Sequence, residues 1–431
     1  MRRELSLYFT AMSAAESVRL VASSVAVLLA GNAGPATQAA RFETAWRHRF
    51  GGDDAVVFPS GRAGLYSLLQ ALGVGPGDEV ILTGYTCEAV AVSVLHGGAV
   101  PVYADIDPLS YSIDPSGVEG LITPKTKVLV IQHTYGIPAP VEQLVALARE
   151  RGLYVIEDAC LAMGSQINRR PLGSFADAAL FSFEVSKTIS AGWGGLVQTN
   201  TPDLGNAVRA ARSTAKPLGR LGVARRLLQA GLSGLLYRPS VMPIAKYLIW
   251  GFFRVKIFKY SASPQEATGH LAPSALSGMD AHWSVLVSQL ARLDQVLERS
   301  RHIAERYQAV LLEHDWPTPM PVPDESIRLI RFPLVVHDAL GMLAYFATEG
   351  IELGRWFDYP IAPPHAFAPF GYAEGSCPVA EEIGHHIVNL PLHSRLSEAD
   401  VTNICSLLDQ YLGEHPNAAS IASRLVSHAA L

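Results

Sequence analysis

Three separated groups of residues carry side chains that could hold a phosphate group, a ring nitrogen and a reactive amine. The first is the turn at 59–62, in which Ser60, Gly61 and Arg62 lead from a short apolar run into an amphipathic segment. Backbone N–H groups at such a turn, together with the positive end of the helix dipole, bind phosphate well. Taken alone, the turn is also compatible with a simple connection between two elements.

The second and third groups are a carboxylate and a lysine at the ends of two apolar runs. Asp158 ends LYVIED, where an acid could hold a cationic nitrogen or simply cap a helix. Lys187 follows AALFSFEVS, which contains Ser182. A lysine enclosed by apolar strands loses solvation, so its amine deprotonates more easily and can form a Schiff base. An exposed lysine after a strand is the alternative interpretation.

The order of these groups indicates one cofactor. A phosphate-binding turn, a carboxylate and a lysine 29 residues after that carboxylate follow each other as expected for an enzyme of pyridoxal 5'-phosphate. Such an enzyme needs an anion cradle, a partner for the pyridine nitrogen and a lysine that bonds the cofactor. We therefore predict a pyridoxal 5'-phosphate site, and the cysteine and histidine spacings predict no metal site.

The elements that must position these residues alternate between short apolar strands and amphipathic helices. Nearly continuous apolar strands separated by helices indicate an α/β domain with a mostly parallel sheet that is covered on both faces. In such sheets, ligands bind at the carboxyl ends of the strands, where the three groups would meet. The predicted strands are 55–58, 79–83, 100–106, 128–133, 153–158, 178–183 and 194–199.

Residues 1–50 are predicted to form an N-terminal helical arm. The apolar run at 20–30 is about half as long as the roughly 20 residues needed to span a bilayer. The segment after it is amphipathic and leads directly into the first domain. We expect a helix that packs on the body, with a targeting signal as the alternative.

Two further parts follow the arm. Residues 51–283 form the predicted large cofactor-binding domain, and residues 284–431 a linking helix and a smaller C-terminal α+β domain. Within the smaller part, the patterns predict a long helix at 284–311, a strand at 327–336 and a closing helix at 397–413.

The composition excludes several classes of protein. Only 17% of the residues are charged, against roughly 25% in soluble proteins, and 49% are hydrophobic, which excludes a disordered chain. The 34 basic and 39 acidic residues argue against a general nucleic-acid binder. The four cysteines lie far apart, which fits a reduced, cytoplasmic compartment.

The stretch 204–265 has a different charge balance from the rest of the chain. It contains 11 Arg or Lys residues and no Asp or Glu, among apolar and aromatic residues. Prolines and a lysine interrupt its apolar run, so a spanning helix is not expected. We predict a basic apolar insertion at 215–262 that contacts an anionic membrane surface, or instead covers a subunit interface or the active site.

Taken together, the residues resemble the DegT/DnrJ/EryC1/StrS family of sugar aminotransferases, which has the aspartate-aminotransferase fold (fold type I). The similarity runs from about residue 40 to 200 and from about 276 to 410. It is carried by SGRAGLYSLLQALGVGPGDEVIL, VIEDACLAMGS, PLGSFADAALFSFEVSKTISAGWGGLVQTN and CPVAEEIGHHIVNLPLHSRLSEADV. The resemblance implies a large α/β domain, a smaller C-terminal domain and a homodimer with active sites at the subunit interface.

The resemblance also implies roles for the candidate residues. Lys187 would bond pyridoxal 5'-phosphate and later move protons between amino donor and acceptor, and Asp158 would pair with the pyridine nitrogen. Ser182 and the amides of residues 60–62 would hold the phosphate. Family members commonly take the amino group from glutamate and place it on a keto group of a nucleotide-linked sugar. Such products serve glycan, cell-envelope or natural-product biosynthesis.

Around the cofactor, the chain departs from the family pattern. Cys87 stands where an aromatic residue usually stacks on the ring, with Tyr85 close by, and Leu161 stands where Gln or His is common. Ala275 replaces an Asn that reaches the phosphate from the partner subunit. Two alternatives follow: a non-catalytic membrane-surface or regulatory homologue, and an aminotransferase for a lipid-linked or other apolar keto substrate.

The smaller domain supplies the candidate substrate contacts. Arg355, Trp356 and His365 belong to the region of YPIAPPH, which resembles the substrate-facing loop of the family. The expected partners are therefore a small keto substrate and an amino donor, with no nucleic acid.

Overall fold

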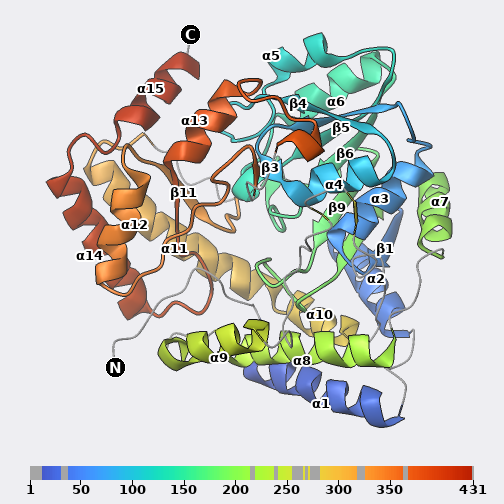
Figure 1. Cartoon of the computed structure of the whole chain (residues 1–431), viewed down its shortest axis with the longest axis horizontal. Coiled ribbons are helices and arrows are strands. Elements are labelled where there is room, and N and C mark those ends of the chain that lie inside the picture. The colour runs from blue at the N-terminus through green and yellow to red at the C-terminus, as the bar shows by residue number, and fades with distance from the viewer. Residues whose placement is uncertain are drawn as a thin grey trace.

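The computed structural model describes residues 12–30, 37–213, 219–236, 241–254, 266, 270–271, 282–317, 326–362 and 367–429. Figure 1 shows a body built on a sheet, a C-terminal group of helices beside it, and a separate layer of helices along one side.

A seven-stranded sheet forms the centre of the body, in the order β1-β10-β9-β6-β5-β2-β4. Strands β9, β6, β5, β2 and β4 are parallel, and β10 runs antiparallel between β1 and β9. The prediction of a mostly parallel sheet in an α/β fold is confirmed, because each predicted strand lies on one of these seven. Their bounds are β1 Asp54–Phe58, β2 Glu79–Thr83, β4 Val100–Ala104, β5 Thr126–Gln132, β6 Tyr154–Asp158, β9 Ala178–Ser182 and β10 Gly195–Thr199.

Alternate side chains of the strands enter cores on opposite faces of the sheet. Val80 and Val128 pack on the face covered by α3 and α4, whereas Ile81 and Leu129 pack on the face covered by α6. This alternation is the two-residue period of a strand, and it explains why both faces are apolar. The covering helices are α3 Gly61–Ala71, α4 Glu88–His96 and α6 Val141–Glu150.

Aromatic side chains fill the core at the β1–β10–β9 end of the sheet. Here α2 (Thr37–Phe50) and α10 (Trp283–Leu290) cover the strands, and the Trp46 ring centroid lies 4.6 Å from that of Phe181. The buried indole N–H of Trp46 donates to Gln198 of β10 at 2.9 Å, which satisfies its polar atom. Other members of the cluster are Phe42, Phe50, Phe183 and Trp283.

The C-terminal part has its own small sheet and helices. Strands β11 (Phe332–Val335) and β13 (Ile387–Leu390) pair antiparallel, so the strand predicted at 327–336 is shorter than expected. The helices are α12 Ala339–Thr348, α13 Pro378–His386, α14 Glu398–Glu414 and α15 Ser420–Ala429. The division into an arm at 1–50, a large domain at 51–283 and a smaller domain at 284–431 stays a proposal.

The single long helix predicted at 284–311 is wrong, because two helices occupy this region. α10 ends at Leu290 and α11 (Leu293–Glu313) begins after a turn in which the Arg292 N–H donates to Gln289 O at 2.9 Å. The side chain of Gln289 in turn bonds the backbone of Ser190, in the loop that carries Lys187. The end of α10 thus contacts a segment about 100 residues earlier in the sequence.

Helices α1 (Ala14–Ala30), α8 (Arg220–Leu236) and α9 (Met242–Arg254) form the separate layer, with α1 and α8 side by side (Figure 1). A Cβ atom added to Gly231 would lie 2.7 Å from Ser17 O, so glycine permits the close approach of α8 to α1. The predicted N-terminal helix thus packs on the body. No helix in the described ranges is both long and apolar enough to cross a bilayer.

Glu16 anchors α1 to the body. Its buried carboxylate accepts hydrogen bonds from the Ser13 N–H at 2.7 Å, from Arg292 at 2.6 Å and from the Ser288 hydroxyl. Burial alone would raise the pKa of Glu16, but these hydrogen bonds and the charge of Arg292 lower it.

Glu16→Gln is expected to lower the free energy of unfolding by about 1–3 kcal/mol at neutral pH. Because the folded pKa is depressed, this stabilisation is present above the unfolded pKa of about 4.3 and is lost as pH falls through the folded pKa. Urea unfolding at pH 7 and near pH 3 measures both effects, with the exposed Glu374→Gln as the control. If Glu16→Gln lowered the free energy of unfolding equally at both pH values, the stabilisation would not come from the charge of Glu16.

Candidate active site

The carboxyl ends of β6 and β9 and the turn after β1 open on one cavity of about 520 Å³, a size typical of ligand pockets. The structure therefore brings together residues that are more than 100 positions apart in the sequence. The predicted residues that line the cavity are Ser60, Gly61, Arg62, Cys87, Asp158, Leu161, Ser182, Lys187 and Trp356.

The turn after β1 has the geometry of an anion cradle. The Ser60 hydroxyl caps α3 by accepting the Ala63 N–H at 3.1 Å, so the first turn of the helix begins at the cavity wall. A Cβ on Gly61 would lie 3.5 Å from Cβ of Ser182, which shows how closely the turn packs on β9. The N-terminal amides of α3 and the Ser182 hydroxyl thus share one part of the cavity, where they fit a phosphate.

The guanidinium of Arg62 is used elsewhere. It forms an ion pair with Glu266, whose side chain is almost fully buried. The predicted phosphate contact of Arg62 is made by its backbone amide. This amide belongs to the start of α3, which faces the cavity.

Asp158 ends β6 with its side chain in the cavity wall. The carboxylate is 5% exposed, and its Oδ1 accepts the Cys160 N–H at 3.0 Å, which fixes its orientation. The backbone carbonyl of Asp158 accepts the His133 N–H at 3.1 Å. A buried, oriented carboxylate suits a partner for a cationic ring nitrogen.

The residue before it points to the opposite face of the strand. Glu157 accepts hydrogen bonds from the N–H groups of Gly173, Phe175 and Ala176, and lies 3.0 Å from Nε2 of His133. Nδ1 of His133 accepts the Ala139 N–H, so a neutral His133 carries its proton on Nε2 and donates to Glu157. This buried network holds the end of β6 from behind.

Lys187 lies on the loop between β9 and β10. Its N–H donates to Glu184 O at 3.1 Å, while the Glu184 carboxylate accepts the N–H and hydroxyl of Ser186 at 2.9 and 2.7 Å. The contacts of Ser190 with Gln289 close the loop on α10. The lysine is thus presented to the cavity by a loop with its own hydrogen bonds.

Two thiols form part of the same wall. Burial raises the pKa of Cys87, and burial together with the neighbouring Asp158 raises that of Cys160. Both side chains therefore stay protonated at neutral pH. With Leu161 they make this side of the cavity apolar, where the family commonly has aromatic and amide or imidazole groups.

Two of the predicted contact residues lie outside the lining of the cavity. Tyr85 is buried away from the cavity, and its hydroxyl lies 2.9 Å from that of Tyr135 and accepts the Phe357 N–H at 3.2 Å. Arg355 donates to the Gly384 and His385 carbonyls at 2.8 and 3.0 Å, at the end of α13, and does not line the cavity. The positions of His365 and Ala275 lie outside the described residues.

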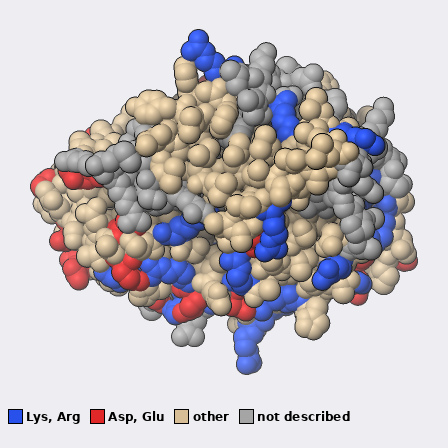
Figure 2. Space-filling view, turned by 90° about the horizontal axis from the view of Figure 1, so that it is seen from below, with Lys and Arg blue, Asp and Glu red and all other residues tan. Residues whose placement is uncertain are grey.

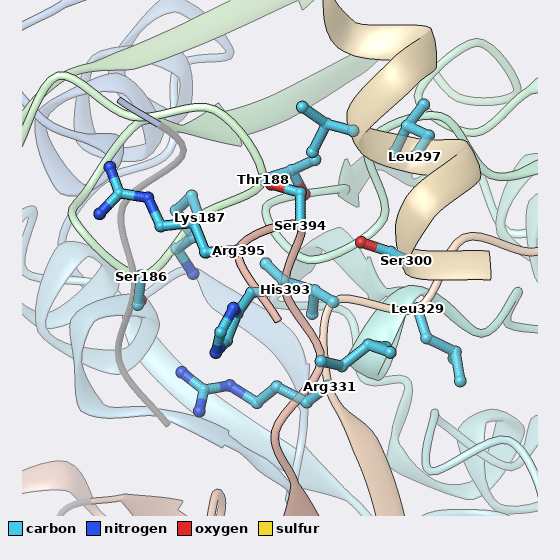
Figure 3. A pocket seen from close by; sticks show the side chains of 13 residues that line it. Ser186, Lys187, Thr188, Leu297, Ser300, Leu329, Arg331, His393, Ser394 and Arg395 are labelled. Atoms are coloured by element: carbon cyan, nitrogen blue, oxygen red, sulfur yellow. The ribbon is translucent and has the colours of Figure 1, made fainter. Parts of the chain in front are cut away.

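Sequence reasoning missed a second group of basic residues beside the lysine. Arg331, His393 and Arg395 line a smaller cavity of about 50 Å³ together with Lys187. Figure 3 shows the side chains of Arg331 and His393 extending toward the side on which Lys187 lies. The Arg331 guanidinium lies 4.7 Å from the centroid of the Trp356 ring. The segment NLPLHSR (389–395), which contains His393 and Arg395, was the available signal for two of these residues.

The insertion forms another wall of the larger cavity. Gln229, Ala230 and Ser233 of α8 line it, together with Trp193. Helix α8 of the insertion therefore lines the site, and a cover over the active site was one of the predicted alternatives.

Comparison with known proteins gives consistent matches. The model of the DegT/DnrJ/EryC1/StrS aminotransferase family matches residues 19–224 and 275–409. The chain is 30% identical over 374 residues to a GDP-perosamine synthase of Caulobacter vibrioides, covering 86% of this chain and 89% of that protein. It is 30% identical over 355 residues to a UDP-N-acetyl-3-dehydro-alpha-D-glucosamine 3-aminotransferase of Acidithiobacillus ferrooxidans, covering 82% and 83%.

Solved structures show the same fold. The aminotransferase TlmJ of Streptoalloteichus hindustanus superposes with a TM-score of 0.71 at 25% identity, covering 95% of this chain and 99% of that one. DesV of S. venezuelae gives the same four values. The expectation of a fold type I architecture is confirmed.

Proposed function

The chain belongs to the DegT/DnrJ/EryC1/StrS aminotransferase family, and we propose that it moves an amino group from glutamate to the keto group of a nucleotide-linked sugar. It is a transaminase that depends on pyridoxal 5'-phosphate. The observation that carries the proposal is the single cavity lined by the turn at 60–62, Asp158, Ser182 and Lys187. Its product would serve glycan, cell-envelope or natural-product biosynthesis, and the nucleotide-sugar enzymes among its relatives support an amino sugar as that product.

The residues fit the cofactor by their chemistry. Pyridoxal 5'-phosphate, when bound, withdraws electrons from the carbon that bears the amino group. The amides at the start of α3 and the Ser182 hydroxyl would bind its phosphate, and the Asp158 carboxylate would keep its ring nitrogen protonated. Lys187 would bond the cofactor and then hold or release a proton at Nζ.

Glutamate tests the proposal directly. Purified protein with pyridoxal 5'-phosphate is expected to show the visible absorption of a lysine-bound cofactor, and glutamate should bleach it. A nucleotide-linked keto sugar should then restore the absorption. Cofactor binding without a response to any amino acid would instead support the non-catalytic homologue.

Arg331 is expected to bind a carboxylate of the amino donor, because it is a buried cation that shares a small cavity with Lys187. Losing a hydrogen bond between charged groups costs about 1.5–3 kcal/mol, so Arg331→Gln should raise the KM for glutamate about 10- to 100-fold. Steady-state kinetics at saturating acceptor measure this change. Arg355→Gln is the matched control, because the Arg355 guanidinium faces α13. An equal rise of the KM for glutamate in both variants would refute the role of Arg331 as the carboxylate-binding residue.

A keto sugar carried by a lipid is the second candidate acceptor. It is favoured by α8, which lines the cavity with one side and belongs to the helical layer with the other. The two acceptors are distinguished by adding a nucleotide-linked or a lipid-linked keto sugar to protein bleached by glutamate. The acceptor that restores the visible absorption is the one that the enzyme uses.

The assembly and location are also proposed. The chain would form homodimers in the cytoplasm, with a peripheral contact to the inner face of an anionic membrane through 215–262. The family resemblance supports the dimer, and the excess of basic over acidic residues in 204–265 supports the membrane contact.

A further inference from the structure

We infer that α1 and α9 together form the membrane-docking surface, with anionic lipid as its partner. This inference rests on the peripheral contact proposed above and deepens it. It adds a helix that lies outside the insertion and nearly 200 residues before it in the sequence.

Strongly exposed large apolar side chains are concentrated on the three-helix layer. Leu29 of α1 is 82% exposed and Trp250 of α9 is 61% exposed, values unusual for such side chains in contact with water. Among the described residues, only Val100, Tyr154, Leu312 and Leu340 of this kind lie elsewhere. The members of the layer are Val18, Val25, Leu28 and Leu29 on α1, Leu221 on α8, Val241 before α9, and Ile244, Tyr247, Leu248 and Trp250 on α9.

Helix α1 is apolar on both of its sides. Leu20 and Val27 are buried on the side that packs on the body, yet Val18, Leu28 and Leu29 are exposed on the other side. A helix on a water-covered surface normally turns polar residues outward. The exposed apolar residues therefore indicate that the outer face of α1 meets an apolar medium.

The charges around this face select the partner. Arg19, Arg220 and Arg254 are exposed on the three helices, while Glu16 is buried, and the stretch 204–265 contains no acidic residue. In Figure 2 the face is mostly tan with blue side chains among and around it, and the red ones gather at one end and along the lower edge. A second copy of this face would bring like charges together, whereas anionic headgroups neutralise them.

The chemistry of α9 fits the boundary between headgroups and acyl chains. Tyr247 and Trp250 carry an apolar ring and a polar atom, which suits this boundary. The Arg254 guanidinium lies 5.1 Å from the centroid of the Trp250 ring, so a cation sits beside the apolar anchor. Since no described helix is long and apolar enough to cross a bilayer, the layer would lie in the interface.

Vesicle co-sedimentation tests the surface with the full-length protein. We expect binding to vesicles that contain phosphatidylglycerol, and weaker binding to pure phosphatidylcholine vesicles or at high salt. Leu29→Asp and Trp250→Asp should each weaken binding at least about tenfold, because each replaces an apolar side chain that would enter the membrane by a charge. Leu340→Asp on α12, where the leucine is 66% exposed, should leave binding unchanged.

Two results would overturn the inference. One is equal loss of binding in Leu340→Asp and Leu29→Asp. The other is a wild type that binds no vesicle but sediments as a dimer that Leu29→Asp dissociates, which would make the face a subunit interface.

Bleaching by glutamate is measured on the same samples. All three substituted residues lie outside the cavity, so each variant should still be bleached by glutamate. Bleaching without lipid binding would refute the docking surface alone, and lipid binding without bleaching in the wild type would refute the proposed transamination alone.

Discussion

Replacing Lys187 by alanine is expected to abolish the visible absorption of the bound cofactor and to slow amino transfer by more than about 10⁴-fold. Among the described residues that line the cavity, Lys187 supplies the only amine. The variant would therefore lose both the covalent attachment of the cofactor and the group that moves the proton, and general acid–base catalysis alone contributes up to about 10⁴-fold. Absorption spectra and single-turnover rates with glutamate measure the two losses.

The fold should survive this change. The loop is held by the backbone of Lys187 and by the side chains of Glu184, Ser186 and Gln289. Lys125→Ala, at an exposed lysine, serves as the matched control. A Lys187→Ala protein that keeps the visible absorption, or a rate within tenfold of the wild type, would show that another amine performs the chemistry.

The parallel sheet could be predicted because its strands carry their own signal. Each strand is an apolar run of four to seven residues, and helices with a different period follow most of the strands. Asp158 and Lys187 could be placed for the same reason, since Asp158 ends one such run and Lys187 comes four residues after another. Local sequence therefore determined which edge of the sheet they share.

Residues outside regular elements were harder to place. Tyr85 and Cys87 are two positions apart, so both would face the cavity in a regular strand. They lie at the bend that leads into the two-residue strand β3 (Thr86–Cys87), where that period does not apply, and only Cys87 lines the cavity. Arg355 faces away because it meets carbonyls at the end of α13, a partner 29 residues later that no local pattern reveals.

The helix break before Leu293 had no sequence signal either. Ala291 and Arg292 both favour helices, and the contact beside the break joins Gln289 to Ser190, 99 residues away. The exposed apolar face of α1 was likewise hidden. Its apolar run shows that an apolar face exists, but only the packing on α8 shows which face points outward.

Asp158→Asn is expected to lower the rate of amino transfer by about 10²–10³-fold, the usual effect of removing one preorganised charged group from an active site. Asparagine keeps the size of the side chain and can still accept the Cys160 N–H, so the local structure should persist. What it lacks is the negative charge, which in this buried position would keep the ring nitrogen of the cofactor protonated. Single-turnover bleaching by glutamate measures the loss, and the pH dependence of the cofactor spectrum should change with it.

The neighbouring residue provides the control for this prediction. Glu157 is also a buried carboxylate on β6, but it faces the loop at 173–176 and His133, not the cavity. Glu157→Gln should therefore reduce the stability to urea, while folded enzyme keeps a bleaching rate within a few-fold of the wild type. If Glu157→Gln slowed bleaching as much as Asp158→Asn, the effect would be that of a disturbed strand. The assignment of Asp158 as the partner of the ring nitrogen would then fail.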